Sequence, residues 1–156
     1  MKQTHNIGKA NHYQRLLVML GLSFLAMFVL MYAMVNSFSD IYPNFNQFYM
    51  SALMAAAMGI IELSIMGWMY QDKKRNALLI TVFIFVLIAV FILIRGQTAI
   101  GDEQFLKSMI PHHSSAILMC KKAEITNSEI AQLCQKIILG QQSEIDQMKN
   151  LLESLK

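Results

Sequence analysis

Three long apolar runs constrain this chain more than any other feature of its sequence. They cover residues 16–35, 48–70 and 77–94, and each can cross a hydrocarbon core of about 30 Å as a helix. Hydrophobic residues make up 55% of the chain and charged residues 15%, a balance too apolar for an ordinary soluble domain. An open strand cannot leave its backbone unpaired in lipid. We therefore expect an all-α protein with three transmembrane helices within residues 16–95.

The first apolar run is predicted to be a membrane span and not a secretory signal peptide. It follows a polar tail, residues 1–15, and it continues for some 20 residues. The apolar core of a signal peptide has only about 7–15 residues and leads to a cleavage site of small residues. Neither property fits residues 16–35, so we expect this segment to remain as a helix.

The short loops predict the orientation of these spans. The tail carries three basic residues, the connection at 36–47 carries none, and the connection at 71–76 carries three. Basic loops stay in the cytoplasm, so the tail and the second connection should face it. The chain after residue 95 should then lie in the periplasm of a bacterium, anchored in the inner membrane. Because orientation in membrane lipid explains the basic clusters, we expect no nucleic-acid partner.

Glu62 is the one acidic or basic side chain in the second apolar run. A carboxylate at the centre of a bilayer costs at least about 2.5 kcal/mol, and such groups usually face protein. Glu62 is therefore a candidate functional residue, although structural hydrogen bonding by the protonated acid is the alternative. Methionines recur on the first two spans, at Met27, Met31, Met34, Met50, Met54, Met58 and Met66. These side chains either line a copper path or, as is common for methionine, simply pack between helices.

Residues 102–156 are predicted to form a helical hairpin after a linker at 96–101. Asp102 is a plausible N-cap of the first helix, which should run to about Glu124. Pro111 lies inside this helix and should kink it, since proline frees the carbonyl four residues earlier. The second helix should start at a capping box that runs from Thr126 to Glu129.

The first helix of the hairpin carries a concentration of soft metal ligands. Helical spacing places Met109 and His113 on one stripe, and His112 and Met119 together on its flank. Neutral imidazole and thioether groups are the ligands that copper(I) prefers. The alternative is that these side chains only fill the core of an amphipathic helix.

The second helix offers weaker candidates for the same site. Its apolar stripe includes Met148, is interrupted by Gln141 and is bordered by Glu144. A turn centred near residue 127 pairs positions that are equally distant from it, so His112 and His113 should lie opposite glutamines 142 and 141.

The same pairing brings the two cysteines of the chain face to face. Cys120 and Cys134 each lie seven residues from the centre of the turn. An oxidising periplasm permits a disulfide, which would staple a small unit. Reduced thiolates that bind copper are the alternative.

The hairpin resembles a bacterial family of helical, ferritin-like domains of unknown function. Two motifs carry the likeness: Asp102-x-x-Phe105-Leu106-x-x-Met109-Ile110-Pro111-His112-His113-x-x-Ala116-Ile117-x-Met119, and Gln142-x-Glu144-Ile145-x-x-Met148. That family includes a periplasmic copper-binding protein of cyanobacteria, and its fuller members carry four helices. The resemblance implies a metal-binding role. Two apolar stripes on one hairpin leave much surface uncovered, so we expect at least a homodimer that forms a four-helix bundle.

We therefore expect a membrane-anchored protein that binds copper(I) or silver(I), in metal resistance or homeostasis. The expected ligands come from His112, His113, Met109 and Met119, with Met148, Gln141 and Glu144 as weaker candidates. A second copy of the chain is the expected partner, and a copper exporter or chaperone is another candidate. An assembly module without metal is the alternative. A ferritin-like enzyme needs several inward carboxylates, and this hairpin offers only Glu144, so we expect no enzyme.

Overall fold

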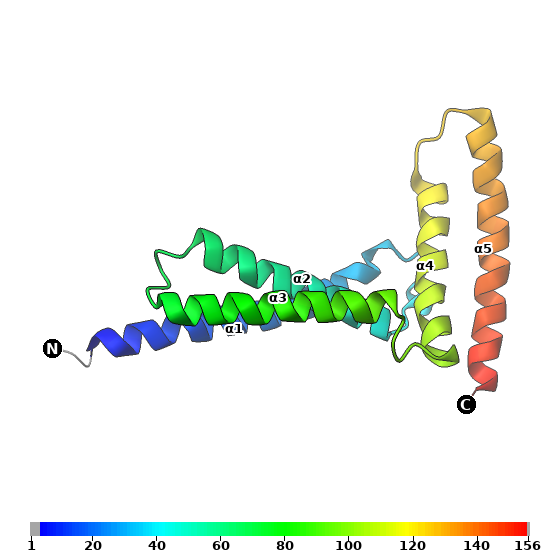
Figure 1. Ribbon diagram of the computed structural model, residues 1–156. Helices are drawn as coiled ribbons and strands as arrows, with labels where there is room; N and C mark the ends of the chain where they lie inside the picture. The colour runs from blue at the N-terminus through cyan, green and yellow to red at the C-terminus, as the bar shows by residue number, and fades with distance from the viewer. Residues whose placement is uncertain (1–3, 156) are drawn as a thin grey trace. The chain divides into compact units, whose positions relative to one another are not determined.

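The computed structural model describes residues 4–155, with side chains described from residue 12 onward. Within that range the chain forms five α-helices and two short 3-10 helices, and no strand (Figure 1). The helices fall into two compact units. The three-helix unit contains residues up to Val29 together with Phe48–Thr98, and the hairpin unit contains Leu30–Gln47 together with the residues from Ala99 onward.

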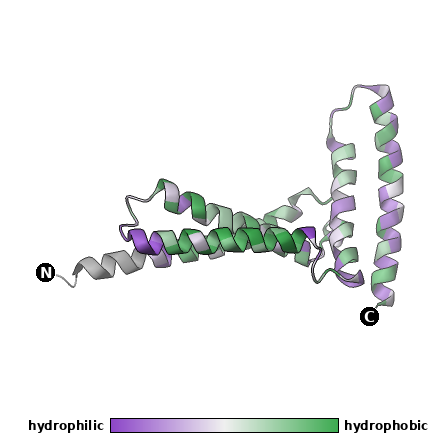
Figure 2. Cartoon of the chain, viewed as in Figure 1, coloured by the Kyte–Doolittle hydropathy of each residue, from purple (hydrophilic) through white to green (hydrophobic). Residues whose placement is uncertain are grey.

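Three helices are long and apolar enough to cross a membrane: α1 (Thr4–Leu30), α2 (Phe45–Ile65) and α3 (Lys73–Arg95). In α1 the apolar stretch begins at His12 and continues through the 3-10 helix η1 to Met34. Figure 2 shows hydrophobic residues around most of the surface of these helices. The all-α class and the three apolar helices expected from the sequence are thus confirmed.

The turn between α2 and α3 differs from its expected position. The second apolar run continues to Tyr70, but α2 ends at Ile65. The basic residues expected in a turn instead form the first turn of α3. Asp72 caps this helix, and its carboxylate accepts a hydrogen bond from the backbone N–H of Arg75 at 3.0 Å. An aspartate at this position satisfies a backbone donor that a helix start leaves open.

The three-helix unit has a small core at the end where α1 begins and α2 finishes. Five side chains from α1, α2 and the following turn form its buried cluster: Tyr13, Leu16, Leu20, Leu63 and Tyr70. Closer to the middle of α2, a methyl group added to Gly59 would lie 2.7 Å from the ring of Phe83 on α3. A small residue is therefore needed where these two helices meet.

In the hairpin unit, α4 (Asp102–Lys122) and α5 (Ser128–Ser154) pack side by side. Their shared core consists of Leu106, Ile110, Ile117, Ile145, Met148 and Leu152. Both expected caps are displaced by one residue. Gly101 precedes α4, with Asp102 as its first helical residue. Asn127 caps α5 in place of Thr126, because its side-chain oxygen accepts hydrogen bonds from the N–H groups of Glu129 and Ile130.

The connection between α1 and α2, residues 31–47, belongs to the hairpin unit and not to a free loop. It contains the 3-10 helices η1 (Met31–Met34) and η2 (Phe38–Asp40), and both contact α4. Tyr42 packs against the hairpin core. The unit is therefore larger than the 102–156 segment expected from the sequence. Its two segments are separated in the sequence by α2 and α3, which are both long enough to cross a membrane.

Candidate metal site

His113 points into the hairpin unit from the middle of α4. Its side chain is only 13% exposed, and its Nδ1 lies 3.0 Å from a carboxylate oxygen of Glu144 on α5. The neighbouring His112 is exposed, and the centroids of the two imidazole rings are 6.0 Å apart. Thus α4 places one imidazole in the interior and the other on the surface beside it.

The surroundings of His113 favour its neutral form. Burial lowers the pKa of the imidazole, the Glu144 carboxylate acts in the opposite direction, and His112 lowers the pKa further. Nδ1 is also completely buried and makes no well-aligned hydrogen bond within the described residues, despite the nearby carboxylate. A neutral imidazole is the form that binds metals, and a buried nitrogen without a proper partner is unusual in a folded protein.

Two polar residues of α5 lie together beside this imidazole. The Gln141 side chain donates a hydrogen bond to Glu144 Oε2 at 3.4 Å. Gln142 instead donates to Asp146 at 3.0 Å. The pairing expected from the sequence therefore has the right region of α5, but Glu144 is the residue that approaches His113.

The three methionines proposed as ligands occupy different environments. Met109 is half-buried against the hairpin core and lies one helical turn before His113. Met148 is inside that core with 9% of its surface exposed, whereas Met119 is 51% exposed. The structure therefore places Met109 near the interior imidazole and leaves Met119, like His112, on the outer face of α4.

The described side chains contain no complete metal site built from His, Cys, Asp and Glu alone. Nowhere among residues 12–155 do three His, Cys, Asp or Glu side chains gather in a group that could hold a metal ion. His113 and Glu144 supply only two such groups. A site at this position would therefore need thioether ligands or ligands from a second chain.

Cys120 and Cys134 are joined by a disulfide, with their Cα atoms 5.2 Å apart. The bond links the last turns of α4 to the second turn of α5, across the loop between the helices. Both thiols are consumed, so the arrangement differs from the alternative in which thiolates bind copper.

A buried polar network that the sequence pattern does not predict lies next to His113. Asp40 is 5% exposed and Ser114 is fully buried. The Ser114 hydroxyl donates to Asp40 Oδ2 at 2.5 Å and accepts from the backbone N–H of Asn36 at 2.9 Å. Lys149 of α5 forms an ion pair with Asp40 Oδ1 at 2.7 Å. The available signal was that Asp40 is the one charge in an otherwise uncharged connection.

Asn44 forms a second tie between the connection and α4, and Pro111 explains its location. A proline inside a helix leaves the carbonyl four residues earlier without its usual partner, which here is the carbonyl of Lys107. The side-chain amide of Asn44 donates to this oxygen at 3.3 Å. Together with the Asp40 network, this contact holds the turn of α4 that carries both histidines.

Glu62 lies in the last turn of α2, and not at the middle of a span as its place in the apolar run indicated. Tyr70 donates a hydrogen bond to Glu62 Oε1 at 3.3 Å. Met50, Met54 and Met58 on the same helix are exposed on its outer surface, whereas Met66 packs against the buried cluster. The row of methionines is thus divided between two environments.

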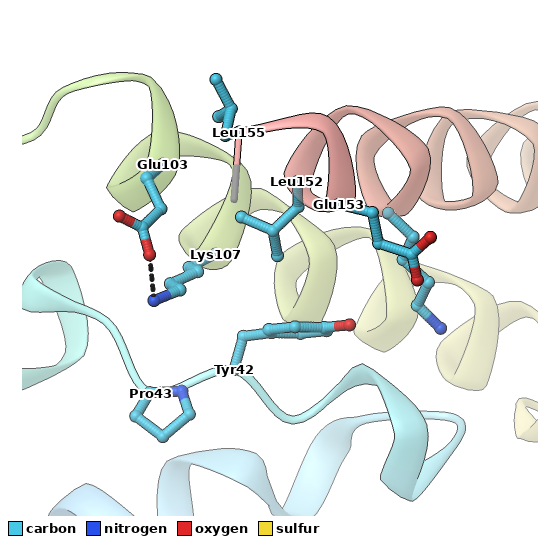
Figure 3. A pocket seen from close by; sticks show the side chains of 8 residues that line it. Tyr42, Pro43, Glu103, Lys107, Leu152, Glu153 and Leu155 are labelled. Carbon is cyan, nitrogen blue, oxygen red and sulfur yellow. Dashed lines mark ion pairs between the residues drawn. The ribbon is translucent and has the colours of Figure 1, made fainter.

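A pocket of about 660 Å³ lies in the hairpin unit where α4 begins and α5 ends, far from the disulfide (Figure 3). Tyr42 and Leu152 supply apolar lining, and a Glu103–Lys107 ion pair of 2.6 Å flanks it. Lys149, which binds Asp40, also lines this pocket. Its charges are mixed in sign, so they single out no class of ligand.

Comparisons with known proteins find one domain family that matches the C-terminal region and one relative that matches most of the chain. Residues 93–152 match a domain family described as a domain of unknown function, DUF305. An uncharacterised protein of Acanthamoeba polyphaga mimivirus is 38% identical over 123 residues, which cover 78% of this chain and 79% of the viral protein. No solved structure matches. The likeness to the viral protein is longer than the matched domain and therefore extends into the residues before it. The chain belongs to the same family as this viral protein, and residues 93–152 are similar to the DUF305 domain family.

Proposed function

We propose that this protein binds copper(I), or the chemically similar silver(I), on the hairpin unit at a membrane surface. The proposed role is binding in metal resistance or homeostasis, and not catalysis. The observation that carries the proposal is the buried Nδ1 of His113, which lacks a well-aligned partner and belongs to an imidazole kept neutral by burial. Imidazole next to thioether is a soft ligand set, and Met109 lies one turn away.

The proposed ligands are divided between the interior and the surface of α4. His113 and Met109 form the inner part of the site, and His112 or Met119 completes it from the exposed flank. Glu144 approaches His113 Nδ1 at 3.0 Å, and Gln141 hydrogen-bonds to the same carboxylate. These two side chains would orient the ring of His113, a contribution typically of about 10–100-fold in metal affinity. Met148 is a weaker candidate because it already fills the hairpin core.

A second copy of the chain is the proposed partner, because one hairpin leaves an apolar face open beside this site. Phe105, His112 and Met119 are spaced seven residues apart on α4, and all three are exposed. On α5 and at its C-cap, Leu133, Leu151 and Leu155 are each about half exposed. Phe105 of α4 and the last two of these leucines line one apolar hollow of about 280 Å³. A homodimer would cover this face and complete a four-helix bundle.

The proposed location is the bacterial inner membrane, with the hairpin unit in the periplasm. The distribution of Lys and Arg over the short loops supports this orientation. An oxidising compartment also suits the Cys120–Cys134 disulfide. Membrane lipid surrounds the three apolar helices in this proposal, and a copper exporter or chaperone would exchange metal with the site.

An assembly module without metal is the second candidate function. It is favoured by the 3.0 Å approach of His113 to Glu144, which links α4 to α5 without any ligand. In that case His113 and Met109 serve only to pack the hairpin, and removal of the imidazole should loosen it.

The test is titration of the full chain in detergent with copper(I), in competition with a chromophoric copper(I) chelator. His113→Ala should lose most of the copper affinity while the helical circular dichroism stays near that of the parent. Met109→Leu conserves volume and should weaken copper binding with little effect on thermal stability. Met54→Leu, on the outer surface of α2, is the matched control and should bind like the parent.

Two results contradict the proposal. If His113→Ala and Met109→Leu both bind copper like the parent, these side chains are not ligands. If His113→Ala unfolds the hairpin and Met109→Leu leaves copper affinity unchanged, the assembly function is favoured.

A further inference from the structure

A separate cavity in the three-helix unit gathers a second set of soft ligands. Its volume is about 210 Å³. It lies between residues 12–19 of α1 and the C-terminal end of α2 with the turn that follows. The lining residues are His12, Arg15, Leu16, Met19, Glu62, Met69 and Tyr70. One imidazole, two thioethers and one carboxylate therefore border a single space, and they come from α1, from α2 and from the turn that follows α2.

The turn that carries Met69 is held in place by polar contacts. Tyr70 donates to Glu62 Oε1 at 3.3 Å, and the carbonyl of Tyr70 accepts from the Asn76 side chain at 2.7 Å. The Asn76 oxygen in turn accepts from the hydroxyl of Tyr13 at 2.6 Å. These hydrogen bonds connect α1, the turn and α3. They therefore hold the α1 side of the cavity in a fixed position relative to the side formed by Glu62 and the turn.

The methionines of this cavity differ from those on the outer surface of the unit. Met19 and Met69 are half-buried and pack against the buried cluster of Tyr13, Leu16, Leu20, Leu63 and Tyr70, whereas Met54 and Met58 are exposed. Apolar packing alone explains buried methionines, but it does not explain why an imidazole and a carboxylate line the same space. A polar and soft lining of this kind matches the preferences of a soft cation.

The charged side chains at the cavity balance each other, so its soft donor atoms, and not its charge, indicate the class of ligand. Glu62 and Arg15 both line it, so the wall carries one negative and one positive side chain. A monovalent cation adds one positive charge to this balance, whereas a divalent cation adds two. An anion in the cavity would be repelled by the Glu62 carboxylate. The hydrogen bond from Tyr70 holds that carboxylate in place at the cavity.

We propose that this cavity is a second site for a soft monovalent cation, copper(I) or silver(I), distinct from the site on the hairpin. Met19, Met69 and His12 supply the ligands. Glu62 offsets the charge of the ion, and Tyr70 positions the Glu62 carboxylate. The proposal stands on the lining of the cavity and does not depend on metal binding by His113.

The test uses silver(I), which is stable in air, titrated into the full chain in detergent micelles by isothermal calorimetry. The background is His113→Ala with Met109→Leu, so that the hairpin site is removed. In this background Met19→Leu with Met69→Leu should lower the silver affinity at least about 10-fold, since both thioethers are lost at nearly constant volume. Met54→Leu with Met58→Leu removes the same number of thioethers from the outer surface and should leave binding unchanged.

A second measurement does not depend on affinity. X-ray absorption of bound silver should show sulfur neighbours in the background and in the control, and their loss in the Met19→Leu, Met69→Leu variant. His12→Gln should reduce the nitrogen contribution while the sulfur neighbours remain. Equal silver binding by the cavity variant and its control, at parental helical content, overturns the proposal. Loss of binding in both variants also overturns it, because the thioethers of the cavity would then have no special role.

Discussion

At the scale of single residues, side chains of the connection between α1 and α2 hold the turn of α4 that carries the two histidines. Asn44 binds the carbonyl that Pro111 releases, and Asp40 binds Ser114, the residue after His113. The sequence predicted the released carbonyl and the His–Met cluster because both follow from local spacing. It did not predict Asn44 or Asp40 as their partners, because those contacts join residues more than 60 positions apart.

Asp40→Asn should loosen this attachment. The amide keeps an acceptor for Ser114 but leaves the Lys149 ammonium without its ion pair. Loss of one partner of a fully buried pair costs about 3 kcal/mol, which is an upper bound here because the Lys149 side chain is 27% exposed. Amide hydrogen exchange should therefore become at least ~10-fold faster in residues 36–42 and in the middle of α4. Asp146→Asn alters an exposed carboxylate on α5 and should leave exchange unchanged. Equal protection in both variants would show that the buried pair does not hold the connection.

At the scale of secondary-structure elements, the pairing of α4 with α5 follows from the symmetry of the hairpin about its turn. That symmetry correctly placed the cysteines together and brought His113 near the right part of α5. The helix starts were less predictable. At α5, Thr126 and Asn127 are both good capping residues, and the choice between them depends on backbone geometry that no local pattern fixes.

The disulfide gives a prediction at this scale. Protein isolated without reductant should be lighter than the reduced protein by the mass of two hydrogens, with one cross-linked peptide that contains Cys120 and Cys134. Closure of a loop of this length stabilises a fold by about 3 kcal/mol in the chain-entropy description, so reductant should lower the melting temperature of the hairpin unit. The Cys120→Ala, Cys134→Ala variant serves as control and should not respond to reductant. Free thiols in protein from an oxidising compartment would contradict the pairing.

At the scale of the whole molecule, the composition of the hairpin unit limits the possible membrane topologies. Residues 30–47 and 99–155 pack into one unit, so if the apolar helices cross a membrane, these residues lie on the same side of it. The chain between them contains α2 and α3, and two crossings return it to the same side. Hydropathy predicted the three helices, but it did not predict that the connection folds onto the hairpin, since that depends on tertiary contacts.

Single cysteines test this topology in a background where both native cysteines are serine. Phe38→Cys and Gln147→Cys replace exposed residues of the connection and of α5, and a membrane-impermeant thiol reagent should label both from the same side. Lys74→Cys, at the start of α3, should be labelled only from the opposite side. The loop charges further predict that the cytoplasmic side is that of Lys74. Labelling of Lys74→Cys and Gln147→Cys from one side would exclude two crossings between connection and hairpin.

The interrupted hairpin unit also has a consequence for biosynthesis. The connection leaves the ribosome first, and its partners in α4 and α5 follow only after both intervening helices have been made. If α3 failed to cross, the hairpin would emerge on the wrong side, and Asp40 and Asn44 would lose their partners on α4 and α5. Closure of the unit thus depends on correct insertion, because the connection and the hairpin can pack together only when both lie on the same side of the membrane.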